Sequence, residues 1–163
     1  MKWVLVILGV LVCLVLIIVI IGYFLPVKHT ASVQILVSAS PAEVWTRLTD
    51  FKGYPAWRKD VKSVDTRSPV EWVEVNDRGD SLPLKIVGQD PGQRLVTQIQ
   101  GHNLPFGGGW EFGLKDNGGS TIVTITENGE VYNPLFRFVA KFIMGHSANL
   151  KKYAGFLDKS FQR

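Results

Sequence analysis

His146 is the residue of this chain whose position best suits chemistry. It lies between Phe142 and Leu150 in a run of apolar residues at helical spacing. An imidazole in such surroundings can hydrogen-bond the hydroxyl or carboxyl group of a ligand, or act as a general acid or base. The alternative is a buried, hydrogen-bonded histidine that serves only the structure, which is the commoner role of a lone histidine on an apolar face.

The other histidines and the single cysteine indicate neither a metal centre nor a nucleophile. His102 is expected in a loop and His29 follows an apolar N-terminal segment, so neither has a partner at metal-ligand spacing. Cys13 lies inside that apolar segment, and the chain has no Gly-x-Ser-x-Gly motif. We therefore predict no metal, no cofactor and no catalytic residues, and the sequence favours a non-enzymatic role without deciding it.

Glu127 and Glu130 could be imagined as a pair of catalytic carboxylates. Three positions apart on a strand, their side chains would point to opposite faces unless a bulge at Asn128-Gly129 realigned them. We expect such a bulge, and we expect both carboxylates to be solvated at the edge of the sheet.

Aromatic residues are the clearest indication of a binding site. Trp110, Phe112 and Leu114 alternate with Glu111, Gly113 and Lys115, so they share one face of a strand that lines either the core or a pocket. Phe106 precedes them with three glycines that could form a flexible lip. No Lys-Ser/Thr pair and no helix start follows these glycines, which excludes a phosphate-binding loop.

Two further residues, Trp57 and Arg58, follow a proline in a short helix. Trp57 either fills the gap between that helix and the sheet or forms part of a pocket rim. In the second case Arg58 would meet an acidic headgroup. The complete set of predicted ligand-binding residues is Trp57, Arg58, Phe106, Trp110, Phe112, Phe142, His146 and Tyr153.

The elements that position these residues follow the order strand, two short helices, several strands and a closing helix. Alternating β-branched residues predict a strand at 29–37. Ser40-Pro41-Ala42-Glu43 combines a capping serine, a proline and a glutamate three positions later, which predicts a helix start and a capping box. A second short helix fits within 51–60. Further strands, separated by turn residues, are predicted at 61–67, 70–76, 82–89, 94–101, 109–115 and 121–132.

The last segment, 133–161, is predicted to form a single helix about 43 Å long. One face is apolar and includes Val139, Phe142, His146 and Tyr153. The other carries four basic residues that are either solvated or in contact with anionic lipid: Arg137, Lys141, Lys152 and Lys159. One antiparallel sheet that curls around such a helix leaves a hollow, and a hollow lined by aromatic and aliphatic residues holds hydrophobic ligands.

The N-terminal segment 3–25 carries no charge and consists mainly of Val, Ile and Leu. It exceeds the roughly 20 residues that a bilayer-spanning helix needs, and Pro26 would end that helix. A cleaved signal peptide is the alternative, but its apolar region usually has only about 7–15 residues before a small-x-small site. We expect a single-pass anchor at 1–26 and one domain at 27–163. Lys2 and Lys28 slightly favour an N-terminus inside and a domain outside.

Charge excludes one class of partner. The net charge is +4, and after Pro26 there are 17 basic residues (18 less Lys2) against 14 acidic ones, or +3. The basic residues form no concentrated stripe, so a nucleic-acid partner is not expected. The domain contains no cysteine and therefore no disulfide, which suits a reducing or an oxidising compartment equally.

Several short motifs carry a family resemblance over residues 30–161. They are Ser40-Pro41-Ala42-Glu43-Val44-Trp45, Asp50-Phe51, Tyr54-Pro55-Ala56-Trp57, Pro105-Phe106-Gly107-Gly108 before Trp110, Thr126-Glu127-Asn128-Gly129-Glu130-Val131 and Asn133-Pro134-Leu135. In this order the chain resembles the START-like, Bet v 1-like superfamily (SRPBCC), in particular its polyketide cyclase/dehydrase and lipid transport type. The resemblance implies an α+β helix-grip fold, in which a seven-stranded antiparallel sheet curves around a long C-terminal helix and two short helices follow the first strand.

The resemblance implies a ligand class rather than one activity, because members bind lipids, sterols or polyketides and some catalyse cyclisation or dehydration. We expect a membrane-anchored domain that binds or transports a hydrophobic small molecule, with a lipid as the first candidate. One alternative is a cyclase/dehydratase-like enzyme that uses His146 with a second polar group. Another is an anchored structural or interaction module with a filled core. The sequence does not indicate the oligomeric state.

Overall fold

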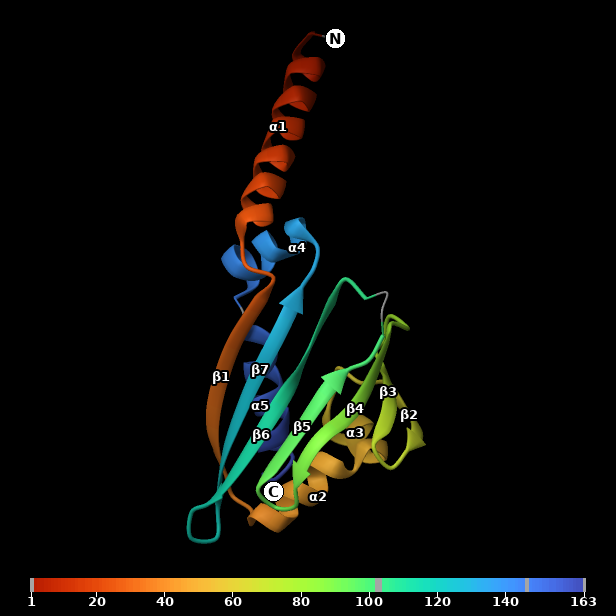
Figure 1. Cartoon of the computed structure of the whole chain (residues 1–163), viewed down its shortest axis with the longest axis vertical. Coiled ribbons are helices and arrows are strands. Elements are labelled where there is room, and N and C mark those ends of the chain that lie inside the picture. Colours follow the sequence, from red (N-terminus) through yellow and green to blue (C-terminus); the bar gives the residue numbers. More distant parts are fainter. Residues whose placement is uncertain (1, 102–103, 146, 163) are drawn as a thin grey trace.

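The computed structural model describes residues 2–101, 104–145 and 147–162 (Figure 1). Helix α1 (Lys2–Phe24) projects from one end of the domain, and within the described residues it is the one helix long and apolar enough to cross a membrane. Strand β1 (Lys28–Val37) then leads into α2 (Pro41–Thr49), the short 3₁₀ turn η1 (Phe51–Gly53) and α3 (Tyr54–Trp57). The remaining elements are β2 (Ser63–Ser68), β3 (Glu71–Val75), β4 (Ser81–Asp90), β5 (Arg94–Ile99), β6 (Phe106–Asp116), β7 (Thr121–Val131), α4 (Pro134–Val139), η2 (Ala140–Met144) and α5 (Ala148–Lys159).

The sheet confirms the predicted fold class. Its seven strands lie in the order β1-β7-β6-β5-β4-β3-β2, and every neighbouring pair is antiparallel. The meander from β2 to β7 follows chain order, and β1 closes the sheet by pairing with β7. Helix α5 packs against β1 and β7, and Leu150, Ala154 and Leu157 are its buried residues.

Helix α2 lies at one end of the domain, and its start is determined by the local sequence. Ser40 and Glu43 form the predicted capping box, in which the Glu43 carboxylate accepts a hydrogen bond from the Ser40 backbone N–H at 2.8 Å. Val44 and Leu48 are completely buried on the inner face of α2. Helix α2 is thereby fixed against the core that the sheet and α5 enclose.

The predicted bulge at Asn128-Gly129 is wrong. Strand β7 runs in unbroken register with β1 on one side and β6 on the other, so that Gly129 pairs with His29 and with Gly108. The glycine has another purpose, because a Cβ atom at Gly129 would overlap the imidazole ring of His29. Gly129 therefore makes room for a side chain over the sheet rather than for an extra residue.

The prediction of one continuous helix over 133–161 is also wrong. After α4 the chain forms the π-helical turn η2, and Gly145 then adopts φ 75° and ψ 139°, a conformation that favours glycine. Helix α5 begins three residues later. The sheet grips α5, whereas α4 and η2 form a separate segment at the end of the domain beside α1 (Figure 1).

Helix α1 is attached to α4 by close packing and by hydrogen bonds. Gly22 is buried against Pro134, whose carbonyl oxygen a Cβ atom at Gly22 would overlap. The guanidinium of Arg137 donates to the carbonyl oxygens of Leu25 at 2.8 Å and Tyr23 at 3.4 Å, and to that of Tyr132 at 3.2 Å. Arg137 therefore caps the C-terminal end of α1. This role differs from the two that the sequence had suggested for Arg137, a solvated position or a contact with anionic lipid.

Candidate functional site

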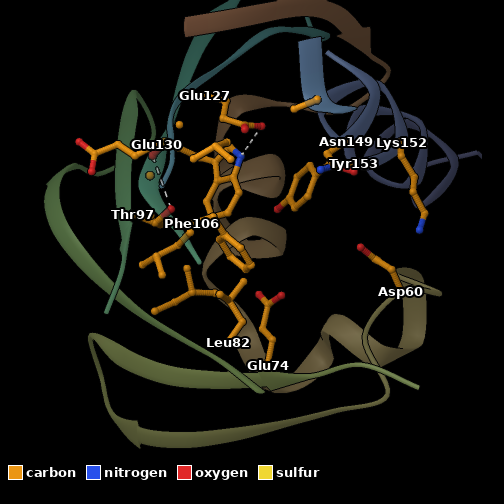
Figure 2. Close-up of a pocket in the computed structure, with 18 of the residues that line it drawn as sticks. Asp60, Glu74, Leu82, Thr97, Phe106, Glu127, Glu130, Asn149, Lys152 and Tyr153 are labelled. Atoms are coloured by element: carbon orange, nitrogen blue, oxygen red, sulfur yellow. Dashed lines mark hydrogen bonds between the residues drawn. The ribbon is translucent and has the colours of Figure 1, made fainter. Parts of the chain in front are cut away.

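A cavity of about 510 Å³ lies between the sheet, α5 and the α4–η2 end of the domain (Figure 2). Its walls are mainly aromatic and aliphatic. The apolar lining residues are Trp72, Leu82, Leu84, Ile99, Pro105, Phe106, Trp110, Phe112, Val131, Phe136, Val139 and Ala140. The volume is within the range of about 300–1,000 Å³ that small-molecule sites occupy. The core is thus hollow in the way that the curled sheet predicted.

The mouth of the cavity is marked by the lining residues that are still exposed to solvent. These residues are Pro105, Phe106, Phe136, Gly145, Asn149 and Lys152. They come from the start of β6, from α4 and from the start of α5, so the mouth lies at the α4 end of the domain. The opposite end is closed by the packed residues of α2.

One polar cluster in the cavity is centred on Glu127 of β7. Its Oε1 lies 3.2 Å from Nε2 of His29, and its Oε2 accepts a hydrogen bond from Nε1 of Trp110 at 3.3 Å. The side chains of His29 and Glu127 are each only 14% exposed. Figure 2 shows Glu127 pointing into the cavity and Glu130 pointing away from it. The two carboxylates therefore do not act together.

A second polar cluster lies on the opposite wall and is centred on Arg58. Its guanidinium donates to Glu74 at 2.9 Å and to Asp60, and it lies 4.9 Å from the centre of the Tyr153 ring. Nε1 of Trp72 also donates to Glu74, at 3.1 Å. Burial alone would lower the pKa of Arg58, but the carboxylates of Glu74 and Asp60 outweigh burial and raise the pKa above its ordinary value. Arg58 is therefore a permanent cation with its charge already balanced.

Tyr153 of α5 lies between these clusters and directs its hydroxyl toward the cavity (Figure 2). This hydroxyl is buried and makes no hydrogen bond of ordinary geometry among the described residues, although it lies near the hydroxyl of Tyr54. Burial raises the pKa of Tyr153 above its ordinary value, so the hydroxyl stays protonated and can donate. An unpartnered buried donor is costly, and a polar atom of a ligand would satisfy it.

The arrangement suits the binding of an amphiphile better than a reaction. Hydrocarbon can fill the apolar walls while a hydroxyl or carbonyl group meets Tyr153 or the Glu127 cluster. Among the described residues no group of three His, Cys, Asp or Glu side chains could hold a metal ion. His29 and Glu127 bring two ionisable groups into contact at the cavity wall.

The structure brings most of the predicted site residues together. Arg58, Phe106, Trp110, Phe112 and Tyr153 line the cavity, although Arg58 is engaged by carboxylates rather than available for an acidic headgroup. Their role in binding remains a prediction, because no ligand contact has tested it.

Two of the predicted residues that the structure describes are not part of the lining. Trp57 lies behind the wall, edge-on to Tyr153 with ring centres 5.7 Å apart, which matches the gap-filling interpretation. Phe142 is 57% exposed and lies outside the cavity, because the break at Gly145 separates it from α5. The position of His146 lies outside the described residues.

Sequence reasoning missed Glu74, and it considered His29 and Glu127 without placing either of them in the site. Glu127 could have been found from strand alternation, because Val123 and Ile125 face the core and the next inward position in an unbroken strand is Glu127. His29 is brought beside it by the pairing of β1 with β7, which no local signal in the sequence specifies.

Comparison with known proteins agrees with this architecture. The model of the family described as polyketide cyclase/dehydrase and lipid transport matches residues 28–159. A search of curated proteins found no match.

Solved structures share the fold at low sequence identity. A START superfamily protein from Mycobacterium smegmatis is 19% identical with a TM-score of 0.67, and the match covers 82% of this chain and 97% of that one. Norcoclaurine synthase from Thalictrum flavum, in complex with dopamine and hydroxybenzaldehyde, is 14% identical with a TM-score of 0.64, and the match covers 82% and 86% of the two chains. The family match spans most of the sequence and the cavity is apolar. This chain is a member of the polyketide cyclase/dehydrase and lipid transport family, with a START-like domain suited to hydrophobic ligands.

Proposed function

We propose that this protein is a membrane-anchored domain that binds and transfers an amphiphilic small molecule, with a lipid as the first candidate. The observation that carries the proposal is the cavity of about 510 Å³, whose walls are mainly apolar and whose polar groups include two clusters, around Glu127 and around Arg58. A ligand with one hydrocarbon body and one polar group matches this division. The unpartnered hydroxyl of Tyr153 supports a ligand that brings a hydrogen-bond acceptor.

The anchor is the second part of the proposal. Helix α1 has 23 residues, and none of its most apolar stretch is buried inside the protein. At 1.5 Å per residue it would be about 34 Å long, enough for a hydrocarbon layer of about 30 Å. A pocket held at a membrane meets lipid at a high effective concentration, which favours a lipid over a ligand that is dilute in water.

The test is ligand binding by the full chain, extracted in mild detergent and depleted of lipid. Titration with a dansyl-labelled fatty acid should give saturable binding with one site per chain. Trp110→Ala, which removes a ring from the cavity wall, should weaken binding roughly tenfold. Val87→Ala is the matched control, because Val87 is half exposed and does not line the cavity.

Native mass spectrometry of the chain purified from membranes completes this test by identifying a co-purified molecule. A folded chain that carries no ligand and shows no saturable binding to fatty acid, phospholipid or sterol would contradict the proposal. That result would favour an anchored interaction module instead. The cavity nevertheless argues against the form of this alternative in which the core of the domain is filled.

A second candidate function, an enzyme, is favoured by one observation. His29 and Glu127 place two ionisable groups 3.2 Å apart inside the cavity, where a bound polyketide-like molecule could exchange a proton with them. Glu127→Gln keeps the shape of the side chain but removes its charge. Turnover of a candidate substrate that is lost in this variant, with binding retained, would support the enzyme. Equal conversion by both proteins would exclude this pair as the catalytic groups.

A further inference from the structure

Helix α4 and turn η2 form a segment with hydrophobic side chains that the domain leaves uncovered. We refer to Pro134–Met144 as the α4–η2 segment. Ile143 is 71% exposed and Phe142 is 57% exposed, and Leu135 and Phe136 are also exposed. The segment carries Arg137 and Lys141 but no acidic residue. Aromatic and aliphatic residues combined with cations are typical of segments that lie in a membrane interface.

The position of this segment is set by α1 and not by the domain alone. Gly22 packs directly on Pro134, and Arg137 donates hydrogen bonds to the carbonyl oxygens of Tyr23 and Leu25. These contacts place the α4–η2 segment beside the last turn of α1, as Figure 1 shows. Tyr23 and Phe24 are 72% and 82% exposed at this end of the helix, where aromatic residues mark the boundary between hydrocarbon and headgroups. The segment therefore lies at that same boundary.

The same segment also forms part of the cavity. Phe136, Val139 and Ala140 line the interior, and Gly145 lies at the mouth directly after the segment. Phe136 is thus both a wall residue and an exposed residue. The outer side chains, Phe142 and Ile143, do not line the cavity. One short segment separates the ligand space from the level at which the membrane surface would lie.

We propose that the α4–η2 segment is an interfacial lid, which inserts Phe142 and Ile143 among the lipid acyl chains and opens the cavity directly to the bilayer that holds α1. This inference rests on the proposed membrane anchoring and deepens it, because it names the partner as a lipid surface and the route as lateral. The ligand then passes from the bilayer to the cavity past Phe136 without crossing bulk water.

The backbone of the segment suits a lid. A π-helical turn is a rare interruption of α-helical structure, and such turns are frequent at functional sites. The N–H of Gly145 bonds to the carbonyl of Ala140 at 3.0 Å, and Gly145 then turns the chain at φ 75°. The segment is consequently separated from α5 by a glycine hinge, while its other end is held by Asn133, whose side chain accepts from the N–H groups of Leu135 and Phe136.

Depth in the membrane can be measured because the chain contains only one cysteine, Cys13. A nitrobenzoxadiazole label on native Cys13 reports whether α1 spans the bilayer. In a Cys13→Ser background, the same label on Ile143→Cys reports the lid, and a label on Asn117→Cys in the exposed β6–β7 turn is the control at the far end of the domain. Each labelled full chain is placed in vesicles of phosphatidylcholine and phosphatidylglycerol that contain nitroxide-labelled acyl chains.

The expected result is quenching at positions 13 and 143 and none at 117. Quenching at 13 but not at 143 would overturn the lid and leave the anchor intact. Absence of quenching at 13 would overturn the anchor and the lid together. Quenching at all three positions would show nonspecific adsorption of the domain and would also overturn the proposal.

A kinetic test addresses the route. The double variant Phe142→Asp, Ile143→Asp should transfer a dansyl-labelled fatty acid out of vesicles roughly tenfold more slowly, because its lid no longer enters hydrocarbon. Its equilibrium binding in detergent should be unchanged, since neither residue lines the cavity. Val87→Asp is the matched control and should transfer at the original rate. Equal transfer rates for the double variant and the control would overturn the lateral route.

Discussion

Arg58 donates a hydrogen bond from Nη1 to Oε1 of Glu74 at 2.9 Å, and both side chains are buried at the wall of the cavity. A buried ion pair is a demanding arrangement, because desolvation opposes the attraction between the charges. Here Asp60 accepts two further hydrogen bonds from Arg58, and Nε1 of Trp72 donates to the same Oε1 of Glu74. The pair fixes α3 to β3 and gives the cavity one rigid polar wall.

Removal of Arg58 should be strongly destabilising. Arg58→Met leaves Glu74 buried without its cation, and we expect a loss of about 3–5 kcal/mol in the free energy of unfolding. Arg94→Met is the matched control, because Arg94 and Glu111 form an ion pair on the exposed face, where solvent screening should make the loss much smaller than for Arg58. Urea unfolding in detergent micelles measures both, and equal losses would contradict the importance of burial.

Gly108 should not tolerate a side chain. It has φ 104°, and an added Cβ atom would overlap the carbonyl oxygen of Asn128 on the neighbouring strand. We expect Gly108→Ala to cost at least about 1–3 kcal/mol, the range for a strained backbone conformation. Gly113→Ala in the same strand meets its nearest atoms at 3.9 Å and should change the stability little. Thermal unfolding that shows the same midpoint for both variants would refute this prediction.

Tyr153→Phe should separate binding from stability. The hydroxyl lies near that of Tyr54 but makes no hydrogen bond of ordinary geometry among the described residues, so its removal should change the unfolding free energy little. If a ligand accepts a hydrogen bond from this hydroxyl, its affinity should fall roughly fivefold to tenfold, the value of one such bond. Calorimetric titration with a fatty acid measures the affinity. A large loss of stability with unchanged affinity would assign the hydroxyl a structural role instead.

The stability of the domain should decline at alkaline pH through Tyr54. Burial raises the pKa of Tyr54 well above its ordinary value of 10.0, and its hydroxyl donates to the carbonyl of Leu48 at 2.7 Å. A group whose pKa is higher in the folded state than in the unfolded state stabilises the folded state. This stabilisation is complete at a pH below the pKa of the unfolded state, and it is lost as the pH rises toward the pKa of the folded state. Unfolding midpoints measured between about pH 9 and pH 11 should fall less steeply for Tyr54→Phe than for the parent chain. Parallel pH profiles would contradict this assignment.

The parts of the fold that were predictable are those encoded by local pattern. Alternation in β1 and the capping box at Ser40 each depend on a few neighbouring residues, and the structure confirms them. The break at Gly145 was not predictable in the same way. One glycine destabilises a helix by only about 1 kcal/mol relative to alanine. Apolar residues that recur at helical spacing on both sides of Gly145 therefore still predict a continuous helix.

The candidate site was predictable only where one strand or helix carries it. Trp110 and Phe112 share a face of β6, and alternation identifies them as a pair. The contact between His29 and Glu127 joins residues that are far apart in the sequence, and strand pairing brings them together. Arg137 likewise reaches α1 only through the packing of α4 against α1. Such contacts depend on the register of the sheet or on the packing of helices in the complete fold. Neither can be deduced from the local sequence around one of the two partners.

The hydrogen bonds of Arg137 have a consequence for the orientation of the domain. Two of them join the end of α1 to α4, and the third goes to Tyr132 just before α4. Only a short segment, Leu25–Val27, separates α1 from β1. If α1 spans a bilayer as proposed, the domain cannot swing freely on a tether, and its cavity faces a single leaflet. A carrier held in this way would load from one monolayer and depend on a separate acceptor to remove the cargo, so Arg137 would help to fix the side on which exchange takes place.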